Sequence, residues 1–127
     1  MIKALDEVTL FVDDVSAVKE WVGKLLGCPI TFESESYCSF AVGAIKLGLH
    51  TRDKKSQGPA ARQVPYWRVE DLHSAIDRFM ALGGSIYRDP IVGIDGPMVC
   101  QMQDPFGNVW GLVAEPVLSH GKPNWSA

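Results

Sequence analysis

Histidine and cysteine side chains are the residues of this chain best suited to nucleophilic or metal chemistry, and their positions favour neither. His73 falls in the first turn of a predicted helix and His120 in a predicted irregular tail, so solvated surface is the simpler interpretation of both. Cys28, Cys38 and Cys100 include no Cys-x-x-Cys pair, and in a reducing compartment they should be free thiols with structural roles.

Hydrolytic and phosphate-binding chemistry also lack a sequence basis. No Ser/His/Asp triad or Cys/His dyad can be argued from the spacing of these residues. Gly83-Gly84 ends a predicted helix, whereas a phosphate-cradling loop precedes one. Any site must therefore be built from side chains that strands and helices bring together.

Composition limits the classes of partner. A chain of 127 residues with 46% hydrophobic and 21% charged residues is long enough to bury the core of one domain. No apolar run approaches the roughly 18 residues of a membrane span, and residues 1–7 lack an apolar signal segment, so a cytoplasmic location without membrane association is expected. The net charge of −3, with no basic run longer than Lys54-Lys55, predicts no nucleic-acid partner.

The first half of the chain shows the alternation of a strand followed by the periodicity of a helix. Apolar residues alternate from Glu7 to Val12, which is typical of a strand with one face on a core. Asp13-Asp14 can cap a helix over Val15–Leu26, which Gly27 then ends. Three short strands are predicted after it: Ile30–Glu33, Tyr37–Val42 and Ile45–Leu49.

The same pattern begins again after a polar linker. A strand over Val64–Val69 precedes Asp71, a predicted cap, and a helix with an apolar face. Val12 corresponds to Val69 at an offset of 69 − 12 = 57, so the chain contains a weak internal repeat of two βαβββ units. The second unit continues with the predicted strands Ile86–Tyr87, Val99–Gln103 and Val109–Ala114.

The last two of these strands form a predicted hairpin with a distinctive turn. Asp104-Pro105-Phe106-Gly107-Asn108 supplies a turn-initiating Asp, a Pro that fixes φ and a Gly that accepts positive φ. This turn, followed by Trp110-Gly111-Leu112, resembles the last hairpin of the vicinal oxygen chelate superfamily, which includes glyoxalase I, bleomycin-resistance proteins and extradiol dioxygenases.

This resemblance implies an α+β fold in which two βαβββ modules curl a mixed sheet into a half-closed trough with the helices outside. The single domain would cover residues 1–115, with modules at about 1–50 and 64–115, a linker at 51–63 and an irregular tail at 116–127. Many single-pair members dimerise so that two chains complete a cavity, and a homodimer is therefore implied. Leu118 and Trp125 of the tail are candidates to dock on the partner surface.

Enzymes of this superfamily hold a divalent metal with one side chain from the first and last strand of each module. The matching positions here are assigned to Glu7, Lys46, Val64 and Gly111, of which only Glu7 can bind a metal. A Lys ammonium would repel the ion, so the resemblance predicts that the metal centre is lost and that no cofactor is bound. An ion pair between Glu7 and Lys46 is expected in its place.

Strand periodicity then selects the side chains that would face the trough. Residues two apart share a face, so Trp67 and Trp110 should pack in the core while their neighbours line the cavity, with His50 at its rim. The predicted ligand-binding residues are Glu7, Thr9, Phe11, Lys46, His50, Tyr66, Arg68, Gln101 and Gln103.

Two classes of function are compatible with this pattern. The first is a metal-independent protein of the bleomycin-resistance type that binds a small organic molecule, and the second is a superfamily isomerase, lyase or dioxygenase with a non-standard or absent metal site. Lys46 and Arg68 against Glu7 leave one net positive charge, which favours a small anionic or aromatic ligand such as an aromatic or enol acid.

Overall fold

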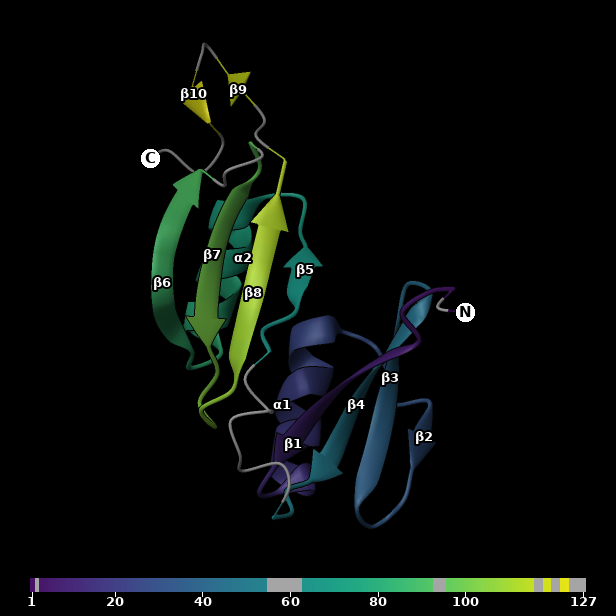
Figure 1. The fold of residues 1–127 in the computed structure, drawn as a ribbon. Helices are drawn as coiled ribbons and strands as arrows, with labels where there is room; N and C mark the ends of the chain where they lie inside the picture. Colours follow the sequence, from purple (N-terminus) through teal and green to yellow (C-terminus); the bar gives the residue numbers. More distant parts are fainter. Residues whose placement is uncertain (2, 55–62, 93–95, 116–117, 120–121, 124–127) are drawn as a thin grey trace. The chain divides into compact units, whose positions relative to one another are not determined.

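The computed structural model describes residues 1, 3–54, 63–92, 96–115, 118–119 and 122–123 (Figure 1). The chain divides into two compact units, Met1–Gln63 and Val64–Ala127, and each is described by itself. Within the described residues, neither helix has the length and apolar character needed to cross a membrane.

The first unit is an open, four-stranded mixed sheet with one helix on one face. Its strands follow the order β1-β4-β3-β2, in which β1 runs parallel to β4 and the other neighbours are antiparallel. The elements are β1 (Glu7–Val12), α1 (Val15–Leu26), β2 (Phe32–Glu33), β3 (Tyr37–Val42) and β4 (Ile45–Thr51).

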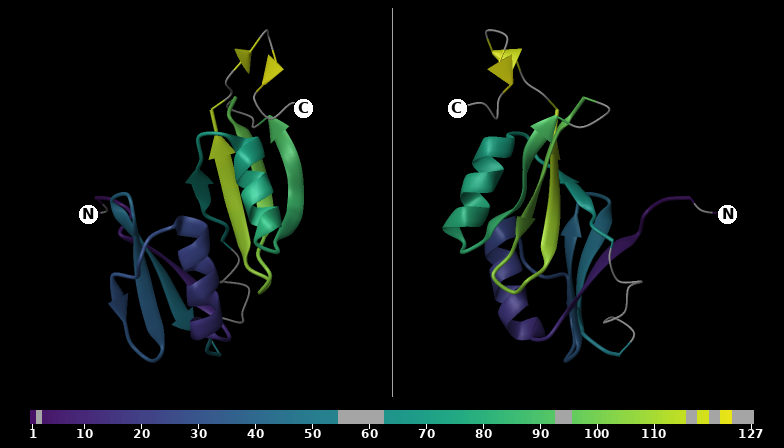
Figure 2. Two further views of the ribbon diagram at one scale, coloured as in Figure 1. Left: turned by 180° about the vertical axis from the view of Figure 1, so that it is seen from behind. Right: turned by 60° about the vertical axis from the view of Figure 1, so that its left-hand side comes forward.

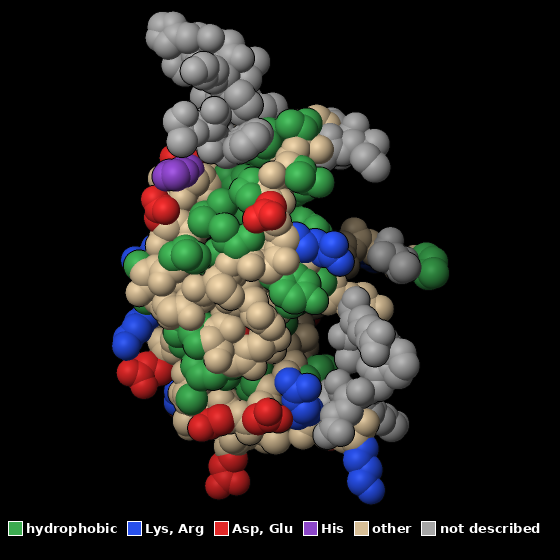
Figure 3. Space-filling view, turned by 90° about the vertical axis from the view of Figure 1, so that its left-hand side faces the viewer, with side chains coloured by type: hydrophobic (Ala, Val, Ile, Leu, Met, Phe, Trp, Pro, Cys, Tyr) green, Lys and Arg blue, Asp and Glu red, His purple; other side chains and the backbone are tan. Residues whose placement is uncertain are grey.

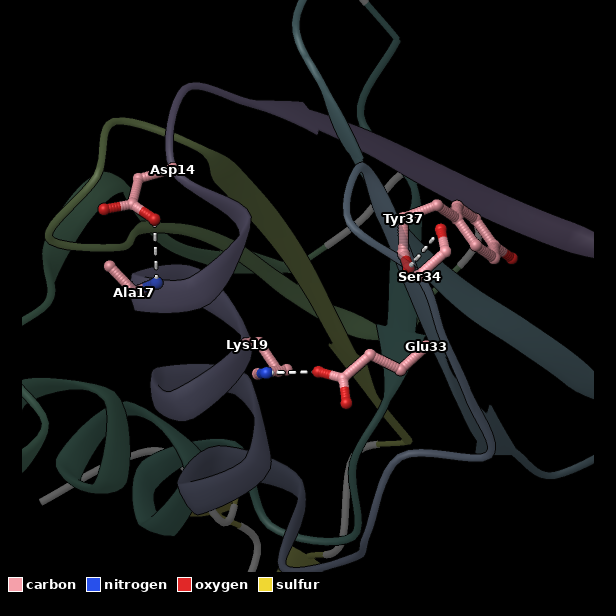
Figure 4. A network of polar contacts seen from close by, with 6 residues as sticks. All are labelled: Asp14, Ala17, Lys19, Glu33, Ser34 and Tyr37. Carbon is pink, nitrogen blue, oxygen red and sulfur yellow. Dashed lines mark hydrogen bonds and ion pairs between the residues drawn. The ribbon is translucent and has the colours of Figure 1, made fainter.

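Local capping explains where α1 begins and ends. The Asp14 side chain accepts a hydrogen bond from the Ala17 backbone N–H at 3.2 Å, which satisfies a donor that the first helical turn leaves free (Figure 4). Gly27 adopts a left-handed φ of 68°, and its N–H bonds to the Gly23 carbonyl at 2.9 Å. Both signals were predicted from the sequence, and the bounds of the helix are confirmed.

The core of the first unit lies between α1 and one face of the sheet (Figure 2). Its buried apolar side chains are Val12, Val18, Trp21, Val22, Cys38, Phe40, Leu47 and Leu49. Lys19 of α1 forms an ion pair with Glu33 of the edge strand β2, and this hydrogen bond raises the pKa of Lys19. Glu33 points toward the helix and the ring of Tyr37 points away from it, as strand alternation requires (Figure 4).

The second unit repeats this architecture. Its strands follow the order β5-β8-β7-β6, with β5 parallel to β8 and the others antiparallel. The elements are β5 (Tyr66–Arg68), α2 (Leu72–Ala81), β6 (Ser85–Val92), β7 (Met98–Gln103) and β8 (Val109–Ala114). Helix α2 covers one face of β6, β7 and β8 (Figure 2), where Trp110 is buried and in ring contact with Trp67 at 6.2 Å. The predicted core position of Trp110 is confirmed, whereas Trp67 is only half-buried.

The turn between β7 and β8 is organised by one buried carboxylate. Asp104 is 4% exposed and accepts hydrogen bonds from the backbone of Phe106 and Asn108, from the Asn108 amide and from Trp110 Nε1, at 2.9–3.0 Å. Gly107 has a φ of 92°, the conformation for which the sequence required glycine. The predicted hairpin is confirmed. Asp104 also connects the turn to the core, because it accepts a hydrogen bond from the buried Trp110.

Some predicted element bounds were wrong. Strand β6 extends from Ser85 to Val92, beyond the predicted Ile86–Tyr87, because an edge strand tolerates Pro90. The tail predicted to be irregular contains a short antiparallel pair, β9 (Leu118–Ser119) with β10 (Lys122–Pro123). His120 and Trp125 lie outside the described residues.

Candidate functional site

Each sheet has one face covered by its helix and a second, open face. On the first unit, the open face carries alternate residues of β1, β4 and β3, which strand pairing places side by side. These residues are Glu7, Thr9, Phe11, Lys46, Gly48, His50, Tyr37, Ser39 and Ala41. The first six were assigned to one face from the sequence, and the structure brings them together as expected.

Glu7 is the centre of a hydrogen-bonded cluster on this face. The Tyr37 hydroxyl donates to Glu7 Oε1 at 2.8 Å, and the Thr9 hydroxyl donates to Oε2 at 2.7 Å. Burial, followed by the hydrogen bond to Glu7, raises the pKa of Tyr37, so the phenol keeps its proton. Both hydroxyls therefore hold the carboxylate in one orientation.

Gly48 lies beneath this cluster, and its lack of a side chain leaves room for the residues above it. A Cβ at Gly48 would lie 2.3 Å from Glu7 Oε2 and 2.9 Å from Tyr37 Cε1, so no larger residue fits without moving these side chains. The Glu7 carboxylate thus leans over Gly48, two residues beyond its register partner Lys46.

The expected ion pair between Glu7 and Lys46 is wrong for the structure. Lys46 Nζ lies 4.0 Å from Asp6 Oδ2, and its side chain is 55% exposed. The physical reason is that the Glu7 carboxylate is directed toward Gly48 and is already hydrogen-bonded by two hydroxyls. Such an exposed pair contributes at most about 1 kcal/mol.

Aromatic rings extend the open face beyond Glu7. The ring of His50 lies 5.6 Å from that of Phe11 and 6.2 Å from that of Tyr37, and Phe32 lies 6.1 Å from Tyr37. His50 Nδ1 donates to the Thr51 carbonyl at 2.8 Å, which fixes the imidazole tautomer. His50, predicted as a rim residue, is therefore one member of a group of aromatic rings.

The open face of the second unit has a similar centre. The ring of Tyr66 lies over Gly111, where an added Cβ would meet three ring carbons at 2.6–2.8 Å. Gln101 Nε2 donates to the Tyr66 hydroxyl at 2.7 Å, and Gln101 is only 8% exposed. Tyr66 itself is 47% exposed, so its ring and hydroxyl can reach a ligand.

Two other predicted site residues of this unit are engaged in local contacts. Arg68 forms an ion pair with Glu115 at 3.3 Å, with both side chains largely exposed. Gln103 Nε2 donates to the Gly107 carbonyl at 3.4 Å and so contacts the hairpin turn. Glu115, which sequence analysis did not select, offsets the positive charge expected from Arg68.

Strand register revises the assignment of the four metal positions. Thr9 pairs with Gly48 and Tyr66 pairs with Gly111, and 66 − 9 = 57 is the offset of the internal repeat. Gly48, rather than Lys46, is therefore the first-module equivalent of Gly111. Alternation along a strand predicts which residues share a face, but it does not predict which residues pair across neighbouring strands. The first-module position was therefore assigned two residues too early, at Lys46.

The residues at these positions do not fit a divalent metal. Glycines at both last-strand positions supply no ligand, Val64 supplies none, and both oxygens of Glu7 accept from hydroxyls. Among the described residues, no group of three His, Cys, Asp or Glu side chains is arranged to hold an ion. All three cysteines are free thiols, as expected, and burial raises the pKa of Cys100 to about 11.

Tyr37 is the site residue that sequence analysis missed. Its strand was predicted, and its alternation with Ser39 was visible, but only the pairing of β3 with β4 brings its hydroxyl to Glu7 across 30 residues of sequence.

The structure contains two βαβββ units, and each has a helix on one face of a mixed sheet and a glycine on the open face. This arrangement defines the class of α+β proteins built from paired modules. The family model of the Glyoxalase/Bleomycin resistance protein/Dioxygenase superfamily matches residues 4–112, and the chain belongs to this superfamily. A comparison with curated proteins gave no significant match.

Solved structures share the fold at low sequence identity. A glyoxalase-related enzyme from Fulvimarina pelagi is 16% identical, with 99% of this chain and 100% of that chain covered and a TM-score of 0.72. A superfamily member from Sphaerobacter thermophilus is 17% identical, with coverage of 90% and 98% and a TM-score of 0.71. A lactoylglutathione lyase from Agrobacterium tumefaciens is 19% identical, with coverage of 89% and 94% and a TM-score of 0.68. At these identities, the likeness shows the fold alone.

Proposed function

We propose that this protein binds a small aromatic or enol acid on the open face of a sheet, without a metal centre, in a cavity that a second copy of the chain completes. The observation that carries the proposal is similar in both units: a glycine stands where superfamily enzymes have a metal ligand, and a neighbouring tyrosine lies close to it. The Tyr66 ring lies over Gly111, and the Glu7 carboxylate with the edge of the Tyr37 ring lies over Gly48; each tyrosine hydroxyl has a polar partner on its own sheet.

Aromatic surface favours a flat ligand. Phe11, Phe32 and Tyr66 are exposed although they belong to sheets with a packed core on the other side. Exposed aromatic rings beside a few oriented polar groups are typical of small-molecule sites, because the rings bind the apolar body and the polar groups fix its orientation.

Hydrogen bonding favours an acid. The Tyr66 hydroxyl accepts from Gln101 and therefore keeps its own hydrogen to donate to a ligand oxygen. The Glu7 carboxylate is compensated by two hydroxyl donors, so it repels an anionic ligand less than a free carboxylate would.

The alternative function is catalysis by an isomerase, lyase or dioxygenase of the same superfamily. The observation in its favour is Glu7, a carboxylate held in one orientation by Thr9 and Tyr37, as a catalytic base would need to be. Both oxygens of Glu7 already accept hydrogen bonds, from Thr9 and Tyr37, which favours binding over proton abstraction.

Calorimetric titration with benzoate, benzamide and benzylamine tests the proposal. We expect benzoate to bind most tightly, and Tyr66→Ala to weaken it by about tenfold through loss of the ring and one hydrogen bond. Phe106→Ala, which removes a comparably exposed ring from the hairpin turn, is the matched control and should leave binding unchanged. Preference for benzylamine, or no benzoate binding at millimolar concentration, would overturn the proposal.

A further inference from the structure

Arg88 occupies a place on the open face of the second unit that its sequence context did not reveal. Arg88 lies in β6 and pairs with Gln101 of β7. Gln101 pairs with Gly111 of β8, and Gly111 pairs with Tyr66 of β5. Residues paired across strands direct their side chains to the same face. Arg88, Gln101, Gly111 and Tyr66 therefore form one row across all four strands of the sheet.

This row lies on the open face rather than the helix face. The neighbours of Gln101 along β7, Cys100 and Met102, are buried in the core, and the Gln101 amide bonds to Tyr66 above Gly111. Strand alternation then assigns Arg88 to the side on which Tyr66 is exposed.

Arg88 is an exposed side chain without a partner among the residues that the structure describes. Its sequence-predicted counterpart, Arg68, is already paired with Glu115 at 3.3 Å, and Lys46 in the other unit has Asp6 within 4.0 Å. An anion that bound Arg68 would have to compete with Glu115, whereas Arg88 offers its whole guanidinium fork.

The backbone of β6 is irregular at this point. The pairing with β7 shifts register between Ile86 and Arg88, and again between Arg88 and Ile91. Bulges of this kind bend a strand and redirect its side chains, and they are common beside binding sites. Because β6 is the outermost strand (Figure 1), this part of the sheet is open to solvent. Figure 3 views the protein from the side on which β6 lies.

We propose that Arg88, together with the Tyr66 hydroxyl, binds the carboxylate of the ligand, and that Arg88 determines the preference for an acid. One carboxylate oxygen accepts from the guanidinium and the other from Tyr66, whose hydroxyl Gln101 orients. The ring of Tyr66 contacts the aromatic body. This inference rests on the proposed function and replaces Arg68 as the residue that selects the charge of the ligand.

Calorimetric titration of benzoate against single variants tests the role of Arg88. We expect Arg88→Ala to raise the dissociation constant by at least about tenfold, since charge-assisted hydrogen bonds contribute about 1.5 to 3 kcal/mol. Arg68→Ala should change it by less than about threefold, the effect of an exposed and already paired charge. Arg88→Lys should be intermediate, because it keeps the charge without the fork. Arg78→Ala on α2 is the control and should have no effect.

The outcomes separate this inference from the proposed function. Benzoate binding that persists in Arg88→Ala but is lost in Arg68→Ala would overturn the role of Arg88 and leave the proposed function in place. Absence of benzoate binding to the wild type would overturn both. Circular dichroism checks that each variant is folded, and Arg88→Gln, which keeps a polar side chain but removes the charge, should reproduce the loss of affinity.

Discussion

At the scale of single residues, two glycines decide what the open faces can do. Gly111 allows the Tyr66 ring to lie directly on the sheet, and Gly48 leaves room for the Glu7 carboxylate and the edge of the Tyr37 ring. The sequence identified Gly111 from its place in the hairpin motif. It placed Gly48 on the same face as Lys46 but did not match it to Gly111, and it did not identify Tyr37, because both inferences depend on the register between strands.

Replacing Gly111 with alanine tests this packing. The added Cβ would meet the Tyr66 ring at 2.6–2.8 Å, so the ring must move and the hydrogen bond from Gln101 is lost. We expect a decrease of about 1 to 3 kcal/mol in the free energy of unfolding, measured by urea denaturation. Gly23→Ala in α1 is the control, because its Cβ meets only Phe40 at 3.9 Å. It should be neutral or stabilising by up to about 1 kcal/mol, and equal losses in both variants would contradict the packing described for Tyr66.

At the scale of elements, hydrophobic periodicity predicted both helices and most strands. Capping residues fixed α1, since Asp14 and Gly27 are strong local signals. The bounds of β6 were missed because Asp89 and Pro90 interrupt its alternation, and its pairing with β7 is itself irregular. Strand pairing depends on residues far apart in the sequence, so local patterns do not predict its register. The ion pair between Glu7 and Lys46 was predicted wrongly for this reason.

The hairpin of β7 and β8 should depend on Asp104. Asp104→Ala removes the acceptor for four hydrogen bonds and leaves the buried Trp110 indole N–H without its carboxylate partner. We expect a loss of about 3 kcal/mol in urea denaturation. The exposed Glu20→Ala in α1, which loses only a pair with Lys24 at 3.6 Å, should change stability by less than about 0.5 kcal/mol. A small effect of Asp104→Ala would show that turn residues alone stabilise the hairpin.

At the scale of the whole molecule, the sequence was sufficient to predict the superfamily and the α+β class, because the hairpin motif and the internal repeat agree. The site was predicted in part. Side chains that share a strand were assigned together correctly, whereas contacts between strands, including those of Tyr37 and Arg88, required the structure.

Homodimerisation is the assembly we propose, from the superfamily resemblance and from the aromatic side chains exposed on the open faces. Multi-angle light scattering at micromolar concentration should give about twice the chain mass of 13.9 kDa. A mass that stays near that of a single chain as the concentration is raised would argue against a cavity shared between two copies.

The central claim is that ligand binding needs no metal, and titration of benzoate against metal-stripped protein tests it most directly. The protein is treated with EDTA, its metal content is measured by mass spectrometry, and the titration is run alone and with one equivalent of Zn²⁺, Mn²⁺ or Ni²⁺. The account predicts the same dissociation constant within about twofold in every case, because Gly48 and Gly111 offer no ligands and Glu7 is occupied by hydroxyl donors. Binding that disappears after EDTA treatment and returns with a stoichiometric metal ion would contradict it.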